Sequence, residues 1–295
     1  MAATEGNPPS TDPGEATTEI GQLRADPART VERMVELRRY MDANVLGPGG
    51  FCCASLATCR GSIRAQDRFY EGQLSHVGRH YDLALDGRPL RIVVVGQEDG
   101  GARTLISLDQ RYEEIHDTSG MARRYYAEPS HPARNPHMRG TTSVLRVILG
   151  QGLGANWEEE FVQTLGGERF HVFDAFALVN ALLCGAHPVG SAQGRSTKVM
   201  RRNCLRHFAA TMQILEPTLM VLQGEGVQSW IGPVLGVMAE RTENLGEAHV
   251  AGNRVLVCRF SHPSAHGVLR WGDRLDAPYL REVVEPTLRL AAESL

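Results

Sequence analysis

Short apolar runs separated by amphipathic stretches dominate this chain. Four of the runs are rich in aliphatic residues and predict buried strands, at residues 91–95, 176–183, 218–222 and 254–260. Helical spacing of apolar residues, with start and stop signals such as Asp26-Pro27 and 47–50, predicts helices at 27–46, 142–149, 157–165, 197–215, 227–235 and 278–293. Strands that alternate with helices predict a three-layer α/β/α sandwich around a central, mostly parallel four-stranded sheet.

Composition limits the class of protein. The chain has 295 residues, of which 42% are hydrophobic, and this suits one large domain at 26–295 after a polar, acidic tail at 1–25 that we expect to be disordered. The net charge is −3, and because residues 1–23 carry four acidic and no basic residues, the remaining chain is close to neutral. No run is long enough to span a bilayer, and the first residues do not resemble a signal peptide, so we expect a soluble, cytoplasmic monomer.

Polar residues follow three of the predicted strands. The sequence G-Q-E-D-G-G occupies 96–101, Asn180 interrupts the apolar run at 176–183, and H-P-S-A follows the last strand at 262–265. Open α/β sheets bind their ligands at the carboxyl ends of parallel strands. The sequence therefore predicts one ligand site built from these three segments, although a solvated turn and a satisfied core asparagine are the structural alternatives.

In this order and context the three motifs resemble the uracil-DNA glycosylase superfamily, over roughly residues 50–290. The resemblance implies that the backbone of Gly96 and Gln97 binds the base and that Asn180 reads the base edge. It implies that His262 stabilises the departing base anion and that Ser264 contacts a DNA phosphate.

Breaking the bond between deoxyribose and base builds positive charge on the sugar and negative charge on the base, so a carboxylate near the sugar and a histidine donor near the base oxygen are the required groups. Glu98 is the first candidate for the carboxylate that orients water, and Asp99 is the second.

The cysteines agree with the iron–sulfur branch of the same superfamily. The chain has six cysteines, and a cytoplasmic compartment disfavours disulfides. The resemblance implies a structural [4Fe–4S] cluster held by Cys53, Cys59, Cys184 and Cys204, with zinc on four sulfurs as the physical alternative. Cys52 is left as an alternative to Cys53, and Cys258 lies within a predicted strand and is expected to be a core thiol.

Several positions depart from the family pattern. The proline of the family's first motif is absent, and the segment that carries a base-stacking phenylalanine corresponds here to P-H-M-R-G at 136–140, with His137 or Met138 at the aromatic position. We assign Met138 to the substrate site and consider Tyr125 or Tyr126 as other sources of stacking. His266 stands where the family often has an apolar wedge. These departures together leave open a preference for uracil or for a related damaged base.

Basic residues near Cys204 predict a DNA-binding surface. Arg195, Lys198, Arg201 and Arg202 cluster on the loop and helix that lead to this cysteine, and with His266 they are candidates for contacts to the DNA backbone. A solvated helix face is the alternative. The insertion at 102–136, which includes a possible strand at 104–108, has the content of a functional lid or flexible loop.

Together these features predict a monofunctional DNA glycosylase that removes uracil or a related damaged base by base flipping. One rival is a catalytically silent member of the superfamily that binds uracil-containing or single-stranded DNA. A second rival is an unrelated flavodoxin-like enzyme that binds phosphate at 96–101, which would require a helix directly after Gly101 and would leave the cysteines unexplained.

Overall fold

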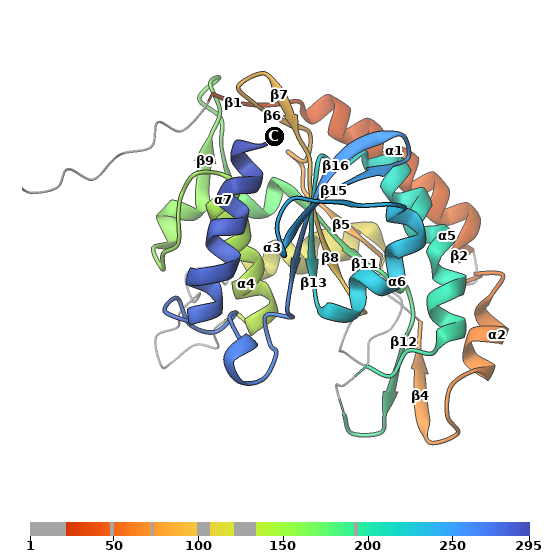
Figure 1. The fold of residues 1–295 in the computed structure, drawn as a ribbon. Helices are drawn as coiled ribbons and strands as arrows, with labels where there is room; N and C mark the ends of the chain where they lie inside the picture. Colours follow the sequence, from red (N-terminus) through yellow and green to blue (C-terminus); the bar gives the residue numbers. More distant parts are fainter. Residues whose placement is uncertain (1–21, 48–49, 72–73, 99–106, 121–133, 192–193) are drawn as a thin grey trace, which may run out of the picture.

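The computed structural model describes residues 22–47, 50–71, 74–98, 107–120, 134–191 and 194–295. Its centre is a seven-stranded mixed sheet (Figure 1). From one edge to the other the strands are β14 (Ala239–Glu240), β15 (Leu245–Val250), β16 (Asn253–Phe260), β13 (Leu219–Gln223), β8 (Ile92–Gly96), β11 (Phe176–Asn180) and β5 (His76–Val77). The inner four strands, β16, β13, β8 and β11, run parallel, and the outer three run antiparallel to their neighbours.

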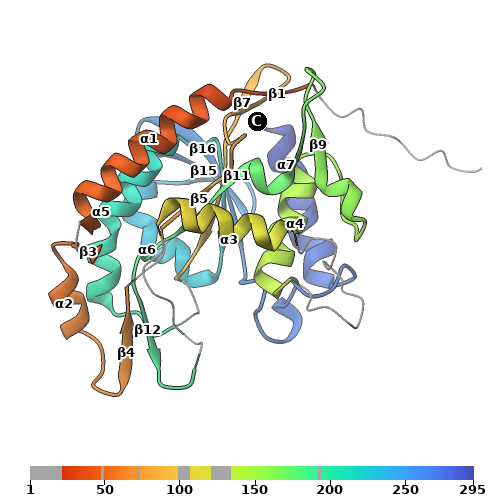
Figure 2. The ribbon, with the colours of Figure 1, turned by 180° about the vertical axis from the view of Figure 1, so that it is seen from behind.

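Helices cover both faces of this sheet (Figures 1 and 2). On one face pack α1 (Pro27–Asn44), α5 (Lys198–Leu215) and α6 (Glu225–Leu235), and on the other pack α4 (Pro136–Ile148) and α7 (Glu285–Glu293). In β8, Val93 and Val95 enter the first core and Ile92 and Val94 enter the second, as the alternation of strand side chains requires. A helix α3 (Leu108–Gly120) packs beside β5, and a short α2 (Leu56–Gly61) lies near α5.

Smaller ribbons surround the main sheet. One has three strands, β1 (Leu23–Ala25), β6 (Leu83–Leu85) and β7 (Arg88–Leu90). The others have two strands each: β9 (Phe161–Gln163) with β10 (Arg169–His171), β12 (Gly185–Pro188) with β4 (Asp67–Tyr70), and β2 (Leu46–Gly47) with β3 (Gly50–Phe51). Short helices of other types are η2 (Trp157–Glu160), η3 (Val172–Asp174), η4 (Gly267–Leu269) and the π-helix η5 (Leu280–Val284). Among the described residues, no helix has the length and apolar composition needed to cross a membrane.

The four predicted strands form the parallel centre, but the sheet is larger than the predicted one. The three added strands are short or follow tight turns, and they are held by antiparallel pairing to strands already present. Leu23–Ala25, which the sequence places in the tail, pair with β6, while residues 1–21 lie outside the described residues. The predicted strand at 176–183 ends at Asn180.

Two local predictions differ from the structure. The predicted helix at 157–165 is wrong, because only η2 is helical and residues 161–163 pair with β10 around a turn that Gly167 closes at φ 83°. Of the possible strand at 104–108, Leu108 begins α3 and residues 104–106 lie outside the described residues. The helices at 27–46, 142–149, 197–215, 227–235 and 278–293 are confirmed, with ends that differ by a few residues and with α4 beginning at Pro136.

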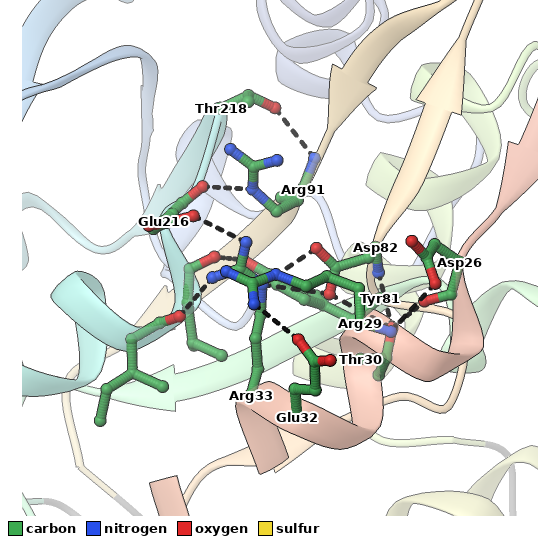
Figure 3. A network of polar contacts seen from close by, with 12 residues as sticks. Asp26, Arg29, Thr30, Glu32, Arg33, Tyr81, Asp82, Arg91, Glu216 and Thr218 are labelled. Carbon is green, nitrogen blue, oxygen red and sulfur yellow. Dashed lines mark hydrogen bonds and ion pairs between the residues drawn. The ribbon is translucent and has the colours of Figure 1, made fainter. Parts of the chain in front are cut away.

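A buried polar network fixes the amino ends of the parallel strands (Figure 3). Arg33 of α1 donates to the Asp82 carboxylate at 2.9 Å and to Glu216 at 2.7 Å, and it also donates to the backbone carbonyl of Ile214. Glu216 follows the end of α5, and its backbone carbonyl accepts a hydrogen bond from Arg91, which precedes β8. This network ties α1 and α5 to the edge opposite the predicted ligand loops.

Candidate functional site

A row of side chains crosses the carboxyl edge of the parallel strands. Asn180 of β11 lies beside Gly96 of β8, and Gln223 of β13 lies beside Phe260 of β16. Since Leu222 pairs with Val95, Gln223 is also the next residue across from Gly96. Alternation along the strands places the whole row on the face covered by α4, because Val94, Leu178 and Val221 two residues earlier enter the core on that face.

The first turn of α4 brings a histidine over this row. Asn135 caps the helix by accepting a hydrogen bond from the backbone N–H of Met138 at 2.9 Å, and Pro136 stands at the first turn. The His137 ring then stacks on His262, with ring centroids 5.4 Å apart and an interplanar angle of 15°.

Gly96 leaves space for these groups. A Cβ atom at this position would lie 3.0 Å from Asn180 Oδ1 and 3.9 Å from His137 Nε2, so both side chains lie above the glycine. Gly96, His137, Asn180, Gln223 and His262 are hereafter called the Gly96 site. The structure thus places the predicted Asn180 at the predicted Gly96, and it places the predicted His262 next to them through its contact with His137.

The loop that carries His262 is held closely against α4. A Cβ atom at Gly140 of α4 would lie 2.7 Å from Pro263 Cβ, so this close approach of helix and loop requires glycine. Trp271 Nε1 donates to the Ser261 carbonyl at 2.8 Å, and the Ser261 backbone N–H donates to the Tyr279 hydroxyl at 3.2 Å. These bonds fix the position of His262 relative to the strand ends.

Both histidines of the site are held neutral. Burial lowers the pKa of His262. Burial, followed by the neighbouring His262 and Arg111, lowers the pKa of His137 to about 3, and a side-chain hydrogen bond with Gln223 opposes this shift. The backbone N–H of Ser264 donates to His262 Nδ1 at 3.1 Å. A neutral His262 therefore carries its proton on Nε2, where it can serve as a hydrogen-bond donor.

The side chains of the first predicted loop turn away from this site. Gln97 Nε2 lies close to the β13–α6 loop, 3.1 Å and 3.2 Å from where Cβ atoms at Gly224 and Gly226 would be. The Glu98 carboxylate accepts backbone N–H groups of Ala186 and Ser196. Asp99 lies outside the described residues.

The Glu98 carboxyl is buried in the β12–α5 loop. Burial raises the pKa of Glu98 to about 7, although the two backbone donors and the charge of Arg201 oppose this shift. One carboxyl oxygen, Oε2, has no hydrogen-bond partner among the described residues. The predicted water-orienting residue is therefore anchored to the neighbouring loop in this conformation.

Of the other residues predicted to contact substrate or DNA, Met138 lies in the core, and Ser264 and His266 lie on the loop after β16. Met138 is buried in the core between α4 and the sheet, so of the two alternatives in 136–140 it is His137 that reaches the site. Ser264 is partly buried, His266 is exposed, and both follow His262 on the same loop. Tyr125 and Tyr126 lie outside the described residues.

Four of the five predicted DNA-binding residues lie at or just before the start of α5, and the fifth, His266, lies on the loop after β16. Arg195, Lys198 and Arg202 are exposed, and the Arg201 guanidinium stacks over the Trp230 ring at 4.1 Å. No acidic residue occurs between 185 and 215. Pairing of β12 with β4 places the exposed Arg68 beside His187, and it also brings the Asp67 carboxylate within 3.6 Å of Arg195, so this basic surface contains one acidic group.

The four predicted cysteine ligands line one small cavity of about 10 Å³. Cys53 and Cys59 come from the segment around α2, Cys184 follows β11, and Cys204 comes from α5. Cys59, Cys184 and Cys204 are buried and Cys53 is partly exposed, whereas the side chain of Cys52 is exposed and Cys258 is a core thiol of β16. This geometry favours Cys53 over Cys52.

Nitrogen donors of α5 surround the cavity sulfurs. Asn203 donates to Cys59 Sγ at 3.4 Å, Arg206 donates to Cys53 Sγ at 3.5 Å, and His207 Nε2 lies 3.4 Å from the same Cys53 sulfur. Burial raises the pKa of the Cys204 thiol to about 11. In the described residues, no three His, Cys, Asp or Glu side chains are gathered closely enough to hold a single metal ion.

No protein-family model matches the chain, and a search of curated proteins also found no match.

Sequence reasoning did not single out Gln223, Thr141 or His207. Gln223 could have been found, because it ends the apolar run of β13 directly before a glycine, much as Asn180 ends β11. Thr141 and His207 lie on helices among many polar residues, and only their contacts in the folded chain distinguish them.

Proposed function

We propose that the protein is a DNA glycosylase that hydrolyses the N-glycosidic bond of uracil or a related deaminated base. The observation that carries the proposal is that Asn180 and His137 lie over Gly96 while His262, neutral and protonated on Nε2, stacks on the His137 ring. These groups supply one amide for a base edge and one uncharged donor for a base oxygen, and they lie at the edge where α/β sheets bind ligands.

In the proposed reaction, Asn180 pairs with the edge of a base extruded from the DNA stack. As the bond from base to deoxyribose breaks, negative charge develops on the base, and His262 Nε2–H stabilises it by a hydrogen bond to a base oxygen. The neutral state of His262 keeps its proton available as a donor without loss of the bond from Ser264. His137 supplies the ring that flanks His262 and the bound base.

A carboxylate is needed to orient water toward the sugar, and Glu98 and Asp99 remain the two proposed residues. In the described conformation Glu98 is held by the backbone of Ala186 and Ser196, so it would act at the sugar only after leaving these donors. Asp99 follows directly in the chain and is the alternative.

The basic surface at the start of α5 is proposed to bind the DNA backbone. Extruding a base costs a few kcal/mol, and phosphate contacts hold the strand while this occurs. Arg195, Lys198 and Arg202 are exposed and lie beside the same carboxyl edge as Asn180.

We further propose that the cysteine cavity holds a [4Fe–4S] cluster on Cys53, Cys59, Cys184 and Cys204. The donor set fits such a group, because four sulfurs from three segments line one cavity and N–H groups point at two of them. When bound, the cluster would fasten the segment around α2 to α5 and so hold the basic surface in place. Zinc is the alternative, and iron, sulfide and zinc analysis of protein purified without oxygen separates the two.

The decisive experiment measures release of uracil from single-stranded oligonucleotides and from duplexes with uracil opposite guanine. Wild type is expected to leave abasic sites that alkali cleaves, and His262→Ala is expected to lower kcat by about 10²- to 10³-fold, the usual effect of removing one such donor. His249→Ala, an exposed histidine of β15, is the matched control. Absence of cleavage by wild type in every substrate would refute the proposal.

A catalytically silent DNA-binding protein is the second candidate, and the anchored Glu98 carboxylate favours it. This candidate predicts tighter binding of uracil-containing DNA than of undamaged DNA, without formation of abasic sites. A binding titration beside the cleavage assay distinguishes the two functions.

A further inference from the structure

The Glu98 side chain joins the carboxyl end of β8 to the loop between β12 and α5. Glu98 stands two residues after Gly96, and its carboxyl accepts the backbone N–H groups of Ala186 and Ser196. Since Oε2 has no hydrogen-bond partner among the described residues, both bonds fall on Oε1. A Cβ atom at Gly194 would overlap Oε1, so the loop closes on the carboxyl because residue 194 is glycine.

The same loop carries the first residue of the basic surface. The Arg195 backbone N–H donates to the Ala186 carbonyl at 2.7 Å, and Arg195 Nη1 lies 3.6 Å from the Asp67 carboxylate of β4. No acidic residue occurs between 185 and 215, so Asp67 and Glu98 contact the loop from distant segments. Glu98 contacts the residues on both sides of Arg195, and its bonds therefore fix the backbone from which this guanidinium extends.

The contacts of Glu98 require an acceptor oxygen rather than a charge. Burial raises the pKa of Glu98 to about 7, although the two backbone donors and the charge of Arg201 oppose this shift. Both N–H groups bond to a single oxygen, and a glutamine side chain offers an oxygen of the same kind. A neutral amide at residue 98 is therefore expected to hold the loop, whereas alanine is not.

We infer that Glu98 is a positioning residue that fixes the β12–α5 loop, and with it Arg195, beside the Gly96 site. It links the strand end that receives the extruded base to the loop that binds a phosphate of the DNA backbone. Phosphate contacts determine how the DNA is placed on a protein, so this link sets the position of the strand relative to the base site. The inference rests on the proposed glycosylase function and assigns Glu98 a role in DNA binding.

The test compares Glu98→Ala with Glu98→Gln in binding to a single-uracil oligonucleotide at several salt concentrations. Glu98→Ala removes both bonds, and the slope of log affinity against log salt is expected to fall by about one, the effect of one lost phosphate contact. Glu98→Gln keeps the acceptor and is expected to restore the wild-type slope. Glu225→Ala, which removes an exposed carboxylate at the start of α6, is the matched control and should also keep that slope.

Kinetics separate this role from a direct role in the reaction. Loss of the loop position is expected to raise KM for the oligonucleotide in Glu98→Ala, with rescue of KM in Glu98→Gln. A residue that acts only on water lowers kcat by about 10²- to 10⁴-fold in both variants and leaves the salt slope of both at the wild-type value. That result would overturn the inference.

A double-variant cycle with Arg195 tests whether Glu98 acts through this residue. Arg195→Gln alone is expected to lower the slope by about one, and adding Glu98→Ala should cause no further fall, because both changes remove the same phosphate contact. Losses that add to about two would show independent effects and would overturn the inference.

Gly194→Ala offers a second way to displace the carboxyl if Glu98→Ala does not fold. The added methyl group takes the place of Oε1 and leaves the glutamate itself intact. Its salt slope is expected to fall by about one, and a wild-type slope in this folded variant would overturn the inference.

DNA binding distinguishes failure of the inference from failure of the proposed function. If wild type binds the oligonucleotide but releases no base, the glycosylase proposal fails, and the slopes of Glu98→Ala and Glu98→Gln still decide the inference. If wild type does not bind the oligonucleotide at any salt concentration, the inference is overturned as well.

Discussion

The network around Arg33 allows a quantitative prediction of stability (Figure 3). Asp82 accepts from Arg33 Nε at 2.9 Å and 3.1 Å and from the Thr30 hydroxyl at 3.3 Å, and its side chain is 7% exposed. Asp82→Asn keeps the volume and removes the charge. Hydrogen bonds to charged groups contribute about 1.5–3 kcal/mol, and loss of one partner of a buried ion pair costs about 3–5 kcal/mol. Since Arg33 keeps Glu216 and the Ile214 carbonyl, we expect a loss near 3 kcal/mol, roughly the lower end of that range.

Urea unfolding followed by circular dichroism and tryptophan fluorescence measures this loss as a lower midpoint with an unchanged m value. Glu216→Gln is the matched control, because this side chain is 37% exposed and its pair with Arg33 is expected to contribute less than about 1 kcal/mol. The reasoning is refuted if Asp82→Asn unfolds within about 0.5 kcal/mol of wild type, or if Glu216→Gln costs as much.

Three further predictions concern the site and its surroundings. The pKa of His137 is about 3 in the folded chain and 6.5 in the unfolded chain. Between these two pH values only the unfolded chain binds a proton at His137, so the free energy of unfolding falls as the pH falls from 6.5 toward 3. In His137→Phe the loss of stability from pH 7 to pH 5 is expected to be smaller by up to about 2 kcal/mol, and equal pH dependence in urea titrations would contradict it. Arg202→Gln should reduce the slope of log affinity for DNA against log salt by about one, whereas Arg24→Gln at the opposite edge should leave it unchanged. Cys184→Ser should lower the iron and sulfide content, Cys258→Ala should not, and equal content in both variants would exclude Cys184 as a ligand.

Local sequence patterns predicted some strands of the central sheet and missed others. Apolar runs identified β8, β11, β13 and β16, because buried parallel strands are apolar on both faces. The strands β5, β14 and β15 were not predicted, since antiparallel pairing rather than their own composition holds them in the sheet. The helix predicted at 157–165 failed for the same reason, as pairing with β10 outweighed helical spacing.

For the candidate site, the sequence by itself determined the types of residue that end the strands. Asn180 could be singled out because it interrupts an apolar run, and the resemblance to a known superfamily indicated His262 and the set of Cys53, Cys59, Cys184 and Cys204. Only the tertiary structure decided where their neighbours point. It turned Glu98 into the β12–α5 loop, placed His137 rather than Met138 over Gly96, and brought the Gln223 amide to the Thr141 hydroxyl. Such orientations depend on contacts between segments far apart in the chain, and no local pattern records them.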